Sequence, residues 1–330
     1  MLSGLAGVKN HKYENGVGSF ESTLNRCVDF NNQMTLYELS IPEGITFIPN
    51  DVFIGCSNLF SIEIPNSLTG IGQDTGGWRY GVFNSCNNLT KVYISDLTQW
   101  CRINFDIEFD NPLSQATALY LNKNLVENLI IPKEITKIKY YTFYNCTSIT
   151  NIEFHDEVLV IGDRAFSNCS GLTSITIPAS VTDIGSSAFY GCTELKVVYN
   201  FSNLIFTKGS YSHGCVAYYA YAIANANEGS HIDEDGDFVW VVSDSSNVLA
   251  LCRNKDLEEV NLQSYYKGQN YEIGERAFIN CNKIIKLTIP NKVTSIGNQA
   301  FDKTSIKELY IEDGDTTLNL GYFSETVGLF

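Results

Sequence analysis

The stretch LTSITIPASVTDIGSSAFYGCTE, residues 172–194, is one complete copy of a unit that recurs along the chain. The stretches IIKLTIPNKVTSIGNQAFDKTS (284–305) and LYELSIPEGITFIPNDVFIGCSN (36–58) keep the same order of apolar, proline and glycine positions. Cys146, Cys169 and Cys192 are 23 residues apart, and a phenylalanine precedes each by three positions. Such a fixed period is the sequence signature of a repeat protein. Ten unit starts can be counted, at Leu36, Leu59, Leu89, Val126, Ile149, Leu172, Leu195, Leu257, Ile284 and Ile306.

Each unit is predicted to begin with a short strand. In LTSITIP the apolar Ile175 and Ile177 alternate with hydroxyl residues, a period of two that is typical of a strand with one buried face. Pro178 cannot donate a ladder hydrogen bond and ends the strand, and Gly185 is expected to turn the chain through a backbone conformation closed to other residues. Because one unit cannot bury its own apolar stripe, the units must stack into a solenoid with a parallel sheet.

The unit resembles the leucine-rich repeat of the BspA-like class, also called the Treponema pallidum type, which occurs in bacterial surface proteins. The motif IP..V..IG..AF..C..L, in which a dot is any residue, holds at 177–195, and its IG..AF part recurs at 161–166, 273–278 and 296–301. The resemblance covers about residues 36–330. It implies an α/β repeat solenoid, a right-handed superhelix of about ten coils with a parallel β-sheet on the concave face. Asn200, before the place of the proline, and Thr304, in place of cysteine, depart from the pattern.

We predict two segments, an N-terminal cap over 1–35 and a repeat domain over 36–330 that ends within a coil. Insertions interrupt the repeat at about 95–121 and 204–252. ALYL and LVENLII, on either side of residues 122–124, are typical of a hairpin. In the second insertion, GCVAYYAYAIANA (214–226) has the alanine content and length of a helix, and FVWVVSDSSNVLALC (238–252) indicates another hairpin.

Six of the ten cysteines share one phase of the repeat. Stacked units hold equivalent side chains parallel at about 4.8 Å, whereas a disulfide needs Cβ atoms about 3.8 Å apart and turned toward each other. We therefore predict buried free thiols that donate weakly to nearby carbonyls. Cys27, Cys101, Cys215 and Cys252 are out of phase, and a pair among them could form a disulfide. The six in-phase residues are Cys56, Cys86, Cys146, Cys169, Cys192 and Cys281.

The composition excludes several classes of partner. A formal net charge of −15 argues against nucleic acid and against anionic membrane surfaces. No stretch approaches the roughly 18 apolar residues of a membrane helix, so we expect no direct membrane insertion. The N-terminal residues lack the basic region and the long apolar run of a secretory signal. The resemblance implies an extracellular or cell-surface protein, with any signal peptide outside this sequence.

The sequence contains no recognisable catalytic or cofactor motif. The four histidines are far apart, and neither a phosphate-binding loop nor a nucleophile elbow is present, so we predict neither enzymatic activity nor a cofactor. DEDGDF (233–238) has the alternate acidic residues that open a calcium loop, but Phe238 stands where the loop needs glycine. We expect a solvated loop there, and no metal site.

The outward strand positions form the candidate binding surface. They are polar and mildly acidic, with isolated tyrosines rather than a contiguous aromatic anchor, so a merely solvated sheet face is one interpretation. The candidate residues are Glu38, Glu63, Lys91, Tyr93, Glu153, Thr176, Tyr199, Glu259, Lys286, Tyr310 and, in a loop, Trp78.

Two classes of binding function are compatible with this surface. BspA-like relatives are associated with adhesion to matrix proteins, so the resemblance implies a non-enzymatic module that binds proteins of the host matrix or of other bacteria. We expect the module to be a monomer. The alternative is a glycan-binding module that uses Tyr93, Trp78 or the aromatic residues of the insertions as stacking platforms. A structural spacer within a larger surface protein is the remaining hypothesis.

Overall fold

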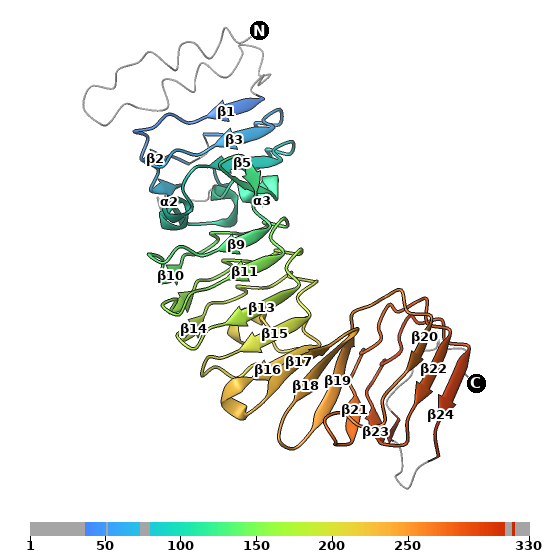
Figure 1. Cartoon of the computed structure of the whole chain (residues 1–330). Helices are drawn as coiled ribbons and strands as arrows, with labels where there is room; N and C mark the ends of the chain where they lie inside the picture. Colours follow the sequence, from blue (N-terminus) through green and yellow to red (C-terminus); the bar gives the residue numbers. More distant parts are fainter. Residues whose placement is uncertain (1–36, 51, 73–79, 314–318, 321–330) are drawn as a thin grey trace. The chain divides into compact units, whose positions relative to one another are not determined.

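The computed structural model of the chain describes residues 37–50, 52–72, 80–313 and 319–320. In this part of the chain, short strands from successive coils lie side by side and form a β-solenoid of about twelve turns with parallel sheets (Figure 1). The predicted cap (1–35), the loop with Trp78 and the end of the predicted incomplete last coil lie outside the described residues. The expected parallel repeat is confirmed, but helices are few. The α-helices among the described residues are α2 (Leu97–Arg102) and α3 (Leu113–Ala116).

The chain divides into two compact units. Unit 1 contains the described residues up to Thr173, together with Ser180–Leu195 and Tyr211–Val216. Its first sheet is parallel except for the antiparallel β7–β8 hairpin. The strands of that sheet, in order, are β1 (Glu38–Ser40), β3 (Ser61–Glu63), β5 (Lys91–Ile94), β7 (Leu119–Leu121) and β8 (Asn124–Leu125). A second parallel pair consists of β9 (Asn128–Ile130) and β11 (Asn151–Glu153).

Unit 1 also has a second row of two-residue strands, which follow the first strand of each coil in the sequence and pair in parallel. One sheet of this row contains β2 (Phe47–Ile48), β4 (Gly70–Ile71) and β6 (Asn104–Phe105). The other contains β10 (Lys137–Ile138), β12 (Val160–Ile161) and β14 (Asp183–Ile184). The 3-10 helices η2 (Glu108–Asp110) and η3 (His213–Cys215) belong to this unit as well.

Unit 2 contains Ser174–Ala179, Lys196–Ser210 and the described residues from Ala217 onward. Two of its sheets are parallel and three-stranded. They are formed by β13 (Ser174–Ile177), β15 (Val197–Asn200) and β16 (Ala222–Asn225), and by β20 (Glu259–Asn261), β22 (Lys286–Ile289) and β24 (Glu308–Ile311). The third sheet has six strands, β17 (His231–Asp235), β18 (Phe238–Val242), β19 (Asn247–Cys252), β21 (Tyr271–Ile273), β23 (Val293–Ile296) and β25 (Asn319–Leu320). A 3-10 helix, η4 (Ala226–Glu228), follows β16.

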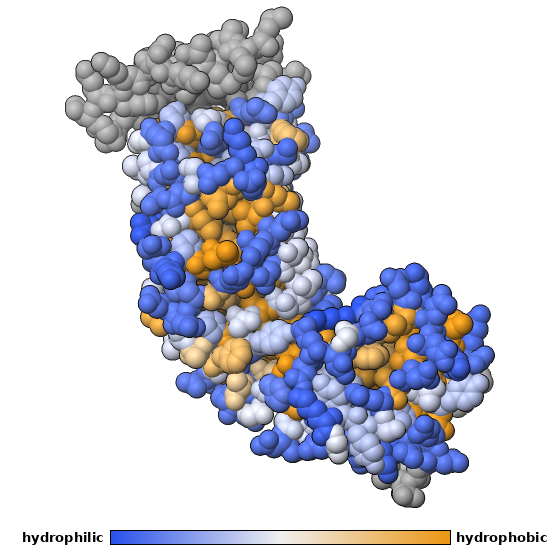
Figure 2. All heavy atoms as spheres, viewed as in Figure 1, coloured by the Kyte–Doolittle hydropathy of each residue, from blue (hydrophilic) through white to orange (hydrophobic). Residues whose placement is uncertain are grey.

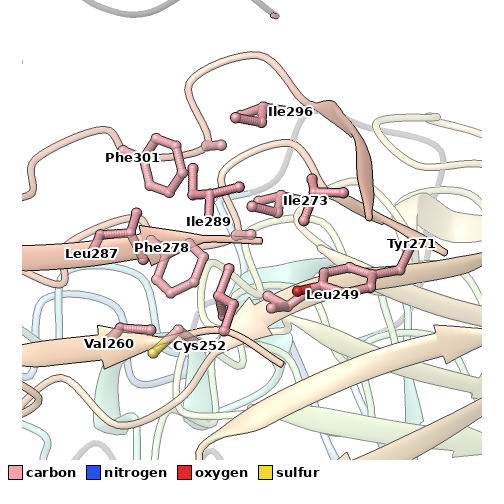
Figure 3. Close-up of a cluster of buried hydrophobic side chains, with 14 of the residues drawn as sticks. Leu249, Cys252, Val260, Tyr271, Ile273, Phe278, Leu287, Ile289, Ile296 and Phe301 are labelled. Atoms are coloured by element: carbon pink, nitrogen blue, oxygen red, sulfur yellow. The ribbon is translucent and has the colours of Figure 1, made fainter. Parts of the chain in front are cut away.

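The cores consist of equivalent side chains stacked from coil to coil. In unit 1 the rings of Phe143, Phe166 and Phe189 form a continuous stack, with successive centroids 5.3 and 5.4 Å apart. In unit 2 Phe278 and Phe301 repeat this contact at 5.4 Å, and Leu287 and Ile289 pack beside them (Figure 3). Each coil therefore completes its core with the coil next to it, as the 23-residue period predicts.

The alternation predicted for the strands is confirmed by burial. Ile175 and Ile177 are buried, whereas Thr176 between them is exposed. The role predicted for Gly185 is wrong, because its backbone is not in the left-handed region. A Cβ atom at this position would instead lie 2.5 Å from the backbone nitrogen of Asp163 in the preceding coil. Glycine is needed here because adjacent coils approach closely, and not because the turn requires a special dihedral angle.

The two hairpins predicted in the insertions are present as β7–β8 and β18–β19. The first is shorter than predicted, because residues 128–130 of its expected second arm form β9 and pair in parallel with β11. In the first insertion Trp100 is buried, lies 5.4 Å from the ring of Phe105, and donates from Nε1 to the carbonyl of Thr142 at 3.1 Å. The hydrogen bond to Thr142 joins the insertion to the coil that follows it.

The helix predicted over 214–226 is wrong, because the second half of this segment forms β16. Ala222 pairs with Val197 in parallel register and packs against Val239 and Ala250 in a buried cluster. Most of the alanines that suggested a helix are buried, and Ala222 lies in the cluster with residues of the β18–β19 hairpin. Tertiary packing outweighs the modest helix propensity of alanine in this segment.

The cysteine prediction is confirmed for the described residues, in which nine cysteines are buried and unpaired by disulfides. Cys86, Cys169 and Cys192 each donate from Sγ to the carbonyl of the core phenylalanine one coil earlier, at 3.1 to 3.2 Å. The out-of-phase Cys101, Cys215 and Cys252 are also free, and Cys27 lies outside the described residues. Burial raises the pKa of the Cys146 thiol to about 11 and that of Cys192 to about 12, so these thiols stay protonated.

Candidate binding surface

The predicted surface residues fall on four sheets, two in each unit. In unit 1, Glu38, Glu63, Lys91 and Tyr93 share the five-stranded sheet, and Glu153 lies on β11. In unit 2, Thr176 and Tyr199 lie on the β13–β15–β16 sheet. The remaining three, Glu259, Lys286 and Tyr310, lie on the β20–β22–β24 sheet. Trp78 lies outside the described residues. In the view of Figure 2, hydrophilic side chains surround smaller apolar patches on both units.

The parallel register of the five-stranded sheet aligns its outward residues. Ser61 lies opposite Lys91, and Glu63 lies between Ser40 on one side and Tyr93 on the other. The hydroxyl of Ser40 donates to Glu63 Oε2 at 2.9 Å. The apolar residues between them, Ile62 and Val92 among others, point into the core and are fully buried.

Aromatic rings gather around Lys91 on this face. The rings of Tyr93 and Tyr120 are 5.1 Å apart, and Lys91 Nζ lies 5.2 Å from the centroid of Phe60 and 5.9 Å from that of Tyr120. We call Phe60, Lys91, Tyr93 and Tyr120 the Lys91 cluster. The expectation of isolated tyrosines is wrong at this point, because β7 extends the sheet and places Tyr120 beside Tyr93. Sequence reasoning assigned Tyr120 to an insertion and so left it out.

The second sheet of unit 1 is polar at its exposed face. The amide of Asn128 donates to Glu153 Oε1 at 2.6 Å, and the amide of Asn151 donates to Asn128 Oδ1 at 2.7 Å. Ile130, which lies opposite Glu153, is 58% exposed. These side chains form a hydrogen-bonded chain across two strands with a single apolar group beside it.

On the first sheet of unit 2, Tyr199 takes part in an ion-pair network. Its hydroxyl donates to Glu234, and Arg253 binds the same carboxylate with two nitrogens at 2.5 and 2.8 Å. Arg253, with Tyr199, lowers the pKa of Glu234, and burial together with Glu234 raises the pKa of Tyr199 to about 12. Tyr199 is therefore occupied by partners within the chain.

On the β20–β22–β24 sheet of unit 2, a lysine and a glutamate form an ion pair. Lys286 Nζ lies 2.7 Å from Glu259 and 5.8 Å from the centroid of the Tyr310 ring. Hydrogen bonding from Lys286 lowers the pKa of Glu259. The hydroxyl of Tyr310 donates to Glu308 at 3.3 Å.

The acidic stretch 233–238 is not the solvated loop that was expected. Residues up to Asp235 form β17, which pairs in antiparallel register with β18. Asp233 forms an ion pair with Lys267, which is the main reason that its pKa is lowered, and Asp237 accepts from the amide of Asn254 at 2.9 Å. Within the described ranges, no group of three or more His, Cys, Asp or Glu side chains could hold a metal ion.

None of the helices in the described part of the chain has the length and apolarity that a bilayer crossing requires.

Stacked parallel strands, a phenylalanine stack and an in-phase cysteine in most coils define a leucine-rich repeat solenoid. Residues 26–105, 116–221 and 249–329 match the BspA type Leucine rich repeat region, in six copies. The chain therefore belongs to the BspA-type leucine-rich repeat family, as the motif had indicated.

Solved structures that match this chain come from several bacteria. A leucine rich cell surface protein from Faecalibacterium prausnitzii is 20% identical, with a TM-score of 0.37 and coverage of 83% of this chain and 69% of that one. The leucine-rich repeat protein of T. pallidum is 16% identical, with a TM-score of 0.24 and coverage of 81% and 76%. The pneumococcal vaccine antigen PcpA is 16% identical, with a TM-score of 0.28 and coverage of 87% and 76%. Among curated proteins, no match to this chain was found.

Proposed function

We propose that the chain is a non-enzymatic binding module of a secreted or surface-attached protein, and that the outward face of the five-stranded sheet binds its protein partner. Membership of a leucine-rich repeat family supports a protein-binding role. The observation that supports the choice of surface is the Lys91 cluster, in which the rings of Tyr93 and Tyr120 and the Lys91 cation lie on the sheet and the ring of Phe60, just before β3, lies beside Lys91. Aromatic side chains grouped at a surface are the usual anchors of protein interfaces.

The aromatic surface extends beyond the cluster. Tyr37 and Phe60 precede β1 and β3, and the backbone nitrogen of Phe60 donates to the carbonyl of Tyr37 at 2.7 Å, which places the two residues in adjacent coils side by side. Tyr37 is 65% exposed and Phe60 is 42% exposed. Large aromatic groups left in water by a folded chain are favourable to bury against a partner.

The family resemblance makes matrix proteins the first partners to test. Immobilised fibronectin and fibrinogen are titrated with the wild-type chain and with Phe60→Ala, Tyr93→Ala and Tyr120→Ala variants. The matched control is Tyr310→Ala, which removes the tyrosine of an equivalent outward strand position in unit 2. We expect at least one unit 1 variant to weaken binding by about tenfold or more, as truncation of an interface anchor does. Wild-type binding that all three variants retain would refute this surface.

A glycan partner is the second candidate, and the paired rings of Tyr93 and Tyr120 favour it. Aromatic rings give the apolar face of a sugar a surface on which to stack. A glycan array with the same variants tests this function. A chain that binds neither matrix proteins nor glycans would be assigned to the spacer role.

A further inference from the structure

The electrostatic surroundings of Lys91 differ from those of the equivalent lysine in unit 2. Lys286 begins β22, and the neighbouring strand positions carry Glu259 and Glu308. Glu259 lies 2.7 Å from the Lys286 ammonium and neutralises it. Lys91 begins β5, but its neighbour on β3 is Ser61, and on the other side β7 pairs only from Val92 onward. In the described part of the chain, no carboxylate lies within ion-pair distance of Lys91.

The Lys91 ammonium lies near aromatic rings instead of a carboxylate. Phe60 and Tyr120 lie 5.2 and 5.9 Å from Lys91 Nζ, measured to their centroids. A cation above a ring is held by the ring quadrupole, but its formal charge is not neutralised. This arrangement, in which the described neighbours of the Lys91 ammonium include aromatic rings but no carboxylate within ion-pair distance, occurs in a chain whose net charge is −15. It leaves the Lys91 ammonium able to bind an external anion.

We propose that the Lys91 cluster binds an acidic sugar, with the carboxylate of the sugar on the Lys91 ammonium and its ring against Tyr93 and Tyr120. This inference rests on the glycan-binding candidate above and names its ligand class. A lysine ammonium forms charge-assisted hydrogen bonds with carboxylates. Glu63, opposite Tyr93 in the register, offers a carboxylate that can accept hydrogen bonds from sugar hydroxyl groups.

The charges around the cluster limit the ligand further. Glu38 and Glu63 lie on the two strands that precede β5 in the sheet, so a polyanion along this face meets repulsion on one side of Lys91. A sugar unit with one carboxylate, such as a sialic acid or a uronic acid, satisfies the single cation without that repulsion. A neutral sugar would stack on the rings but would leave the ammonium without a partner.

The test uses pairs of probes that differ in one carboxylate. Calorimetric titration compares 3′-sialyllactose with lactose, and methyl β-glucuronide with methyl β-glucoside. The variants are Lys91→Met, which keeps most of the apolar stem, Lys91→Arg, which keeps the charge, and Tyr120→Leu. The control is Lys286→Met, which removes the neutralised lysine at the equivalent position. Thermal melting of each variant verifies that it is folded.

We expect at least one acidic probe to bind about tenfold or more tightly than its neutral counterpart, with an affinity that falls as salt is added. Lys91→Met should abolish this preference, Lys91→Arg should retain it in part, and Lys286→Met should leave it unchanged. Equal binding of acidic and neutral probes, the same preference in Lys91→Met, or no binding of either acidic probe would overturn the inference.

Failure of this inference is distinguishable from failure of the proposed function. If matrix-protein binding depends on Tyr93 or Tyr120 but persists in Lys91→Met, and neither acidic probe binds, the surface is a protein-binding site and the acidic-sugar site is refuted. Sialidase treatment of fibrinogen separates the two sources of a carboxylate. Binding that depends on Lys91 and survives the treatment identifies a protein carboxylate as the ligand and overturns the sialic acid form of the inference.

Discussion

The Sγ atom of Cys192 donates a hydrogen bond to the carbonyl oxygen of Phe166, 26 positions earlier in the chain, at 3.2 Å. Cys169 makes the same bond to the carbonyl of Phe143, so the contact between a thiol and the phenylalanine of the preceding coil recurs from coil to coil. The small thiol fills the space at the end of the coil and gives a buried carbonyl a second donor. The in-phase cysteines therefore connect neighbouring coils without a covalent bond.

This arrangement predicts the outcome of thiol titration. In the folded protein the nine described cysteines are buried, so they should react slowly with an aromatic disulfide reagent. After unfolding without reductant, at least nine thiols should react at once. A count near zero after unfolding would contradict the free-thiol arrangement, and alkylation followed by peptide mapping would identify the bonded pairs.

The phenylalanine stack predicts where truncation is most costly. Phe189 is fully buried and stacks on Phe166, so Phe189→Ala should lower the free energy of unfolding by about 3–5 kcal/mol. Thr176 is exposed on the outer strand face, and Thr176→Ala should change the free energy by less than about 0.5 kcal/mol. Urea denaturation of both variants gives the comparison, and similar losses would refute the assigned faces.

The repeat period and the inward strand residues could be predicted because each is imposed by the stacking of coils. The number of residues from one coil to the next could not be predicted. Val197 pairs with Ser174, 23 positions earlier. Ala222, however, pairs with Val197 after 25 positions, and Tyr120 pairs with Tyr93 after 27. Once the spacing changes, β7 and β16 no longer align with the repeat, and this is why Tyr120 was missed as a surface residue.

Another signal was present in the sequence but was not used. The residue before the in-phase cysteine has a left-handed backbone, with φ of 60° at Asn145, 62° at Asn168 and 78° at Gly191. Asparagine and glycine tolerate this conformation better than other residues. The contacts of Lys91 with aromatic rings, in contrast, depend on which residues the neighbouring coils place beside it. A local sequence pattern does not predict those neighbours.

Asn200 shows that a departure from the repeat motif can stabilise the fold. The motif places an apolar residue there, but Asn200 is buried, donates to Asn225 Oδ1 at 2.8 Å and accepts from the hydroxyl of Ser202 at 2.7 Å. Asn200→Leu restores the apolar residue and leaves those buried groups without their partner. We expect it to lower the free energy of unfolding by about 1–3 kcal/mol.

Thr304→Cys is the matched control for this variant, since it also restores a motif residue. Thr304 is only partly buried and its hydroxyl donates to the carbonyl of Phe301 at 2.8 Å, a bond that a thiol can replace in weaker form. Its effect on urea denaturation should stay within about 1 kcal/mol. A gain in stability for Asn200→Leu would show that the buried network contributes less than an apolar side chain would.

The loss of folding stability at low pH should depend on the ion pair between Arg253 and Glu234. Arg253 lowers the pKa of Glu234 in the folded chain below its ordinary value of about 4.5. The carboxylate thus binds its proton more weakly in the folded than in the unfolded state. Its contribution to stability is fully present above about pH 4.5 and is lost as the pH falls through the lower pKa of the folded state.

Arg253→Met should therefore reduce the melting temperature at about pH 7 and make the decline between about pH 5 and pH 3 shallower, because Glu234 then titrates at closer to the same pH in both states. Both side chains are more than a third exposed, so solvent screening keeps the effect small. Lys283→Met, which breaks the more exposed pair with Asp256, is the control and should leave the acid slope closer to that of the wild type. Melting curves recorded across this pH range test the prediction. If the melting temperature of Arg253→Met falls with pH as steeply as that of the wild type, this ion pair is not the source of the loss of stability in acid.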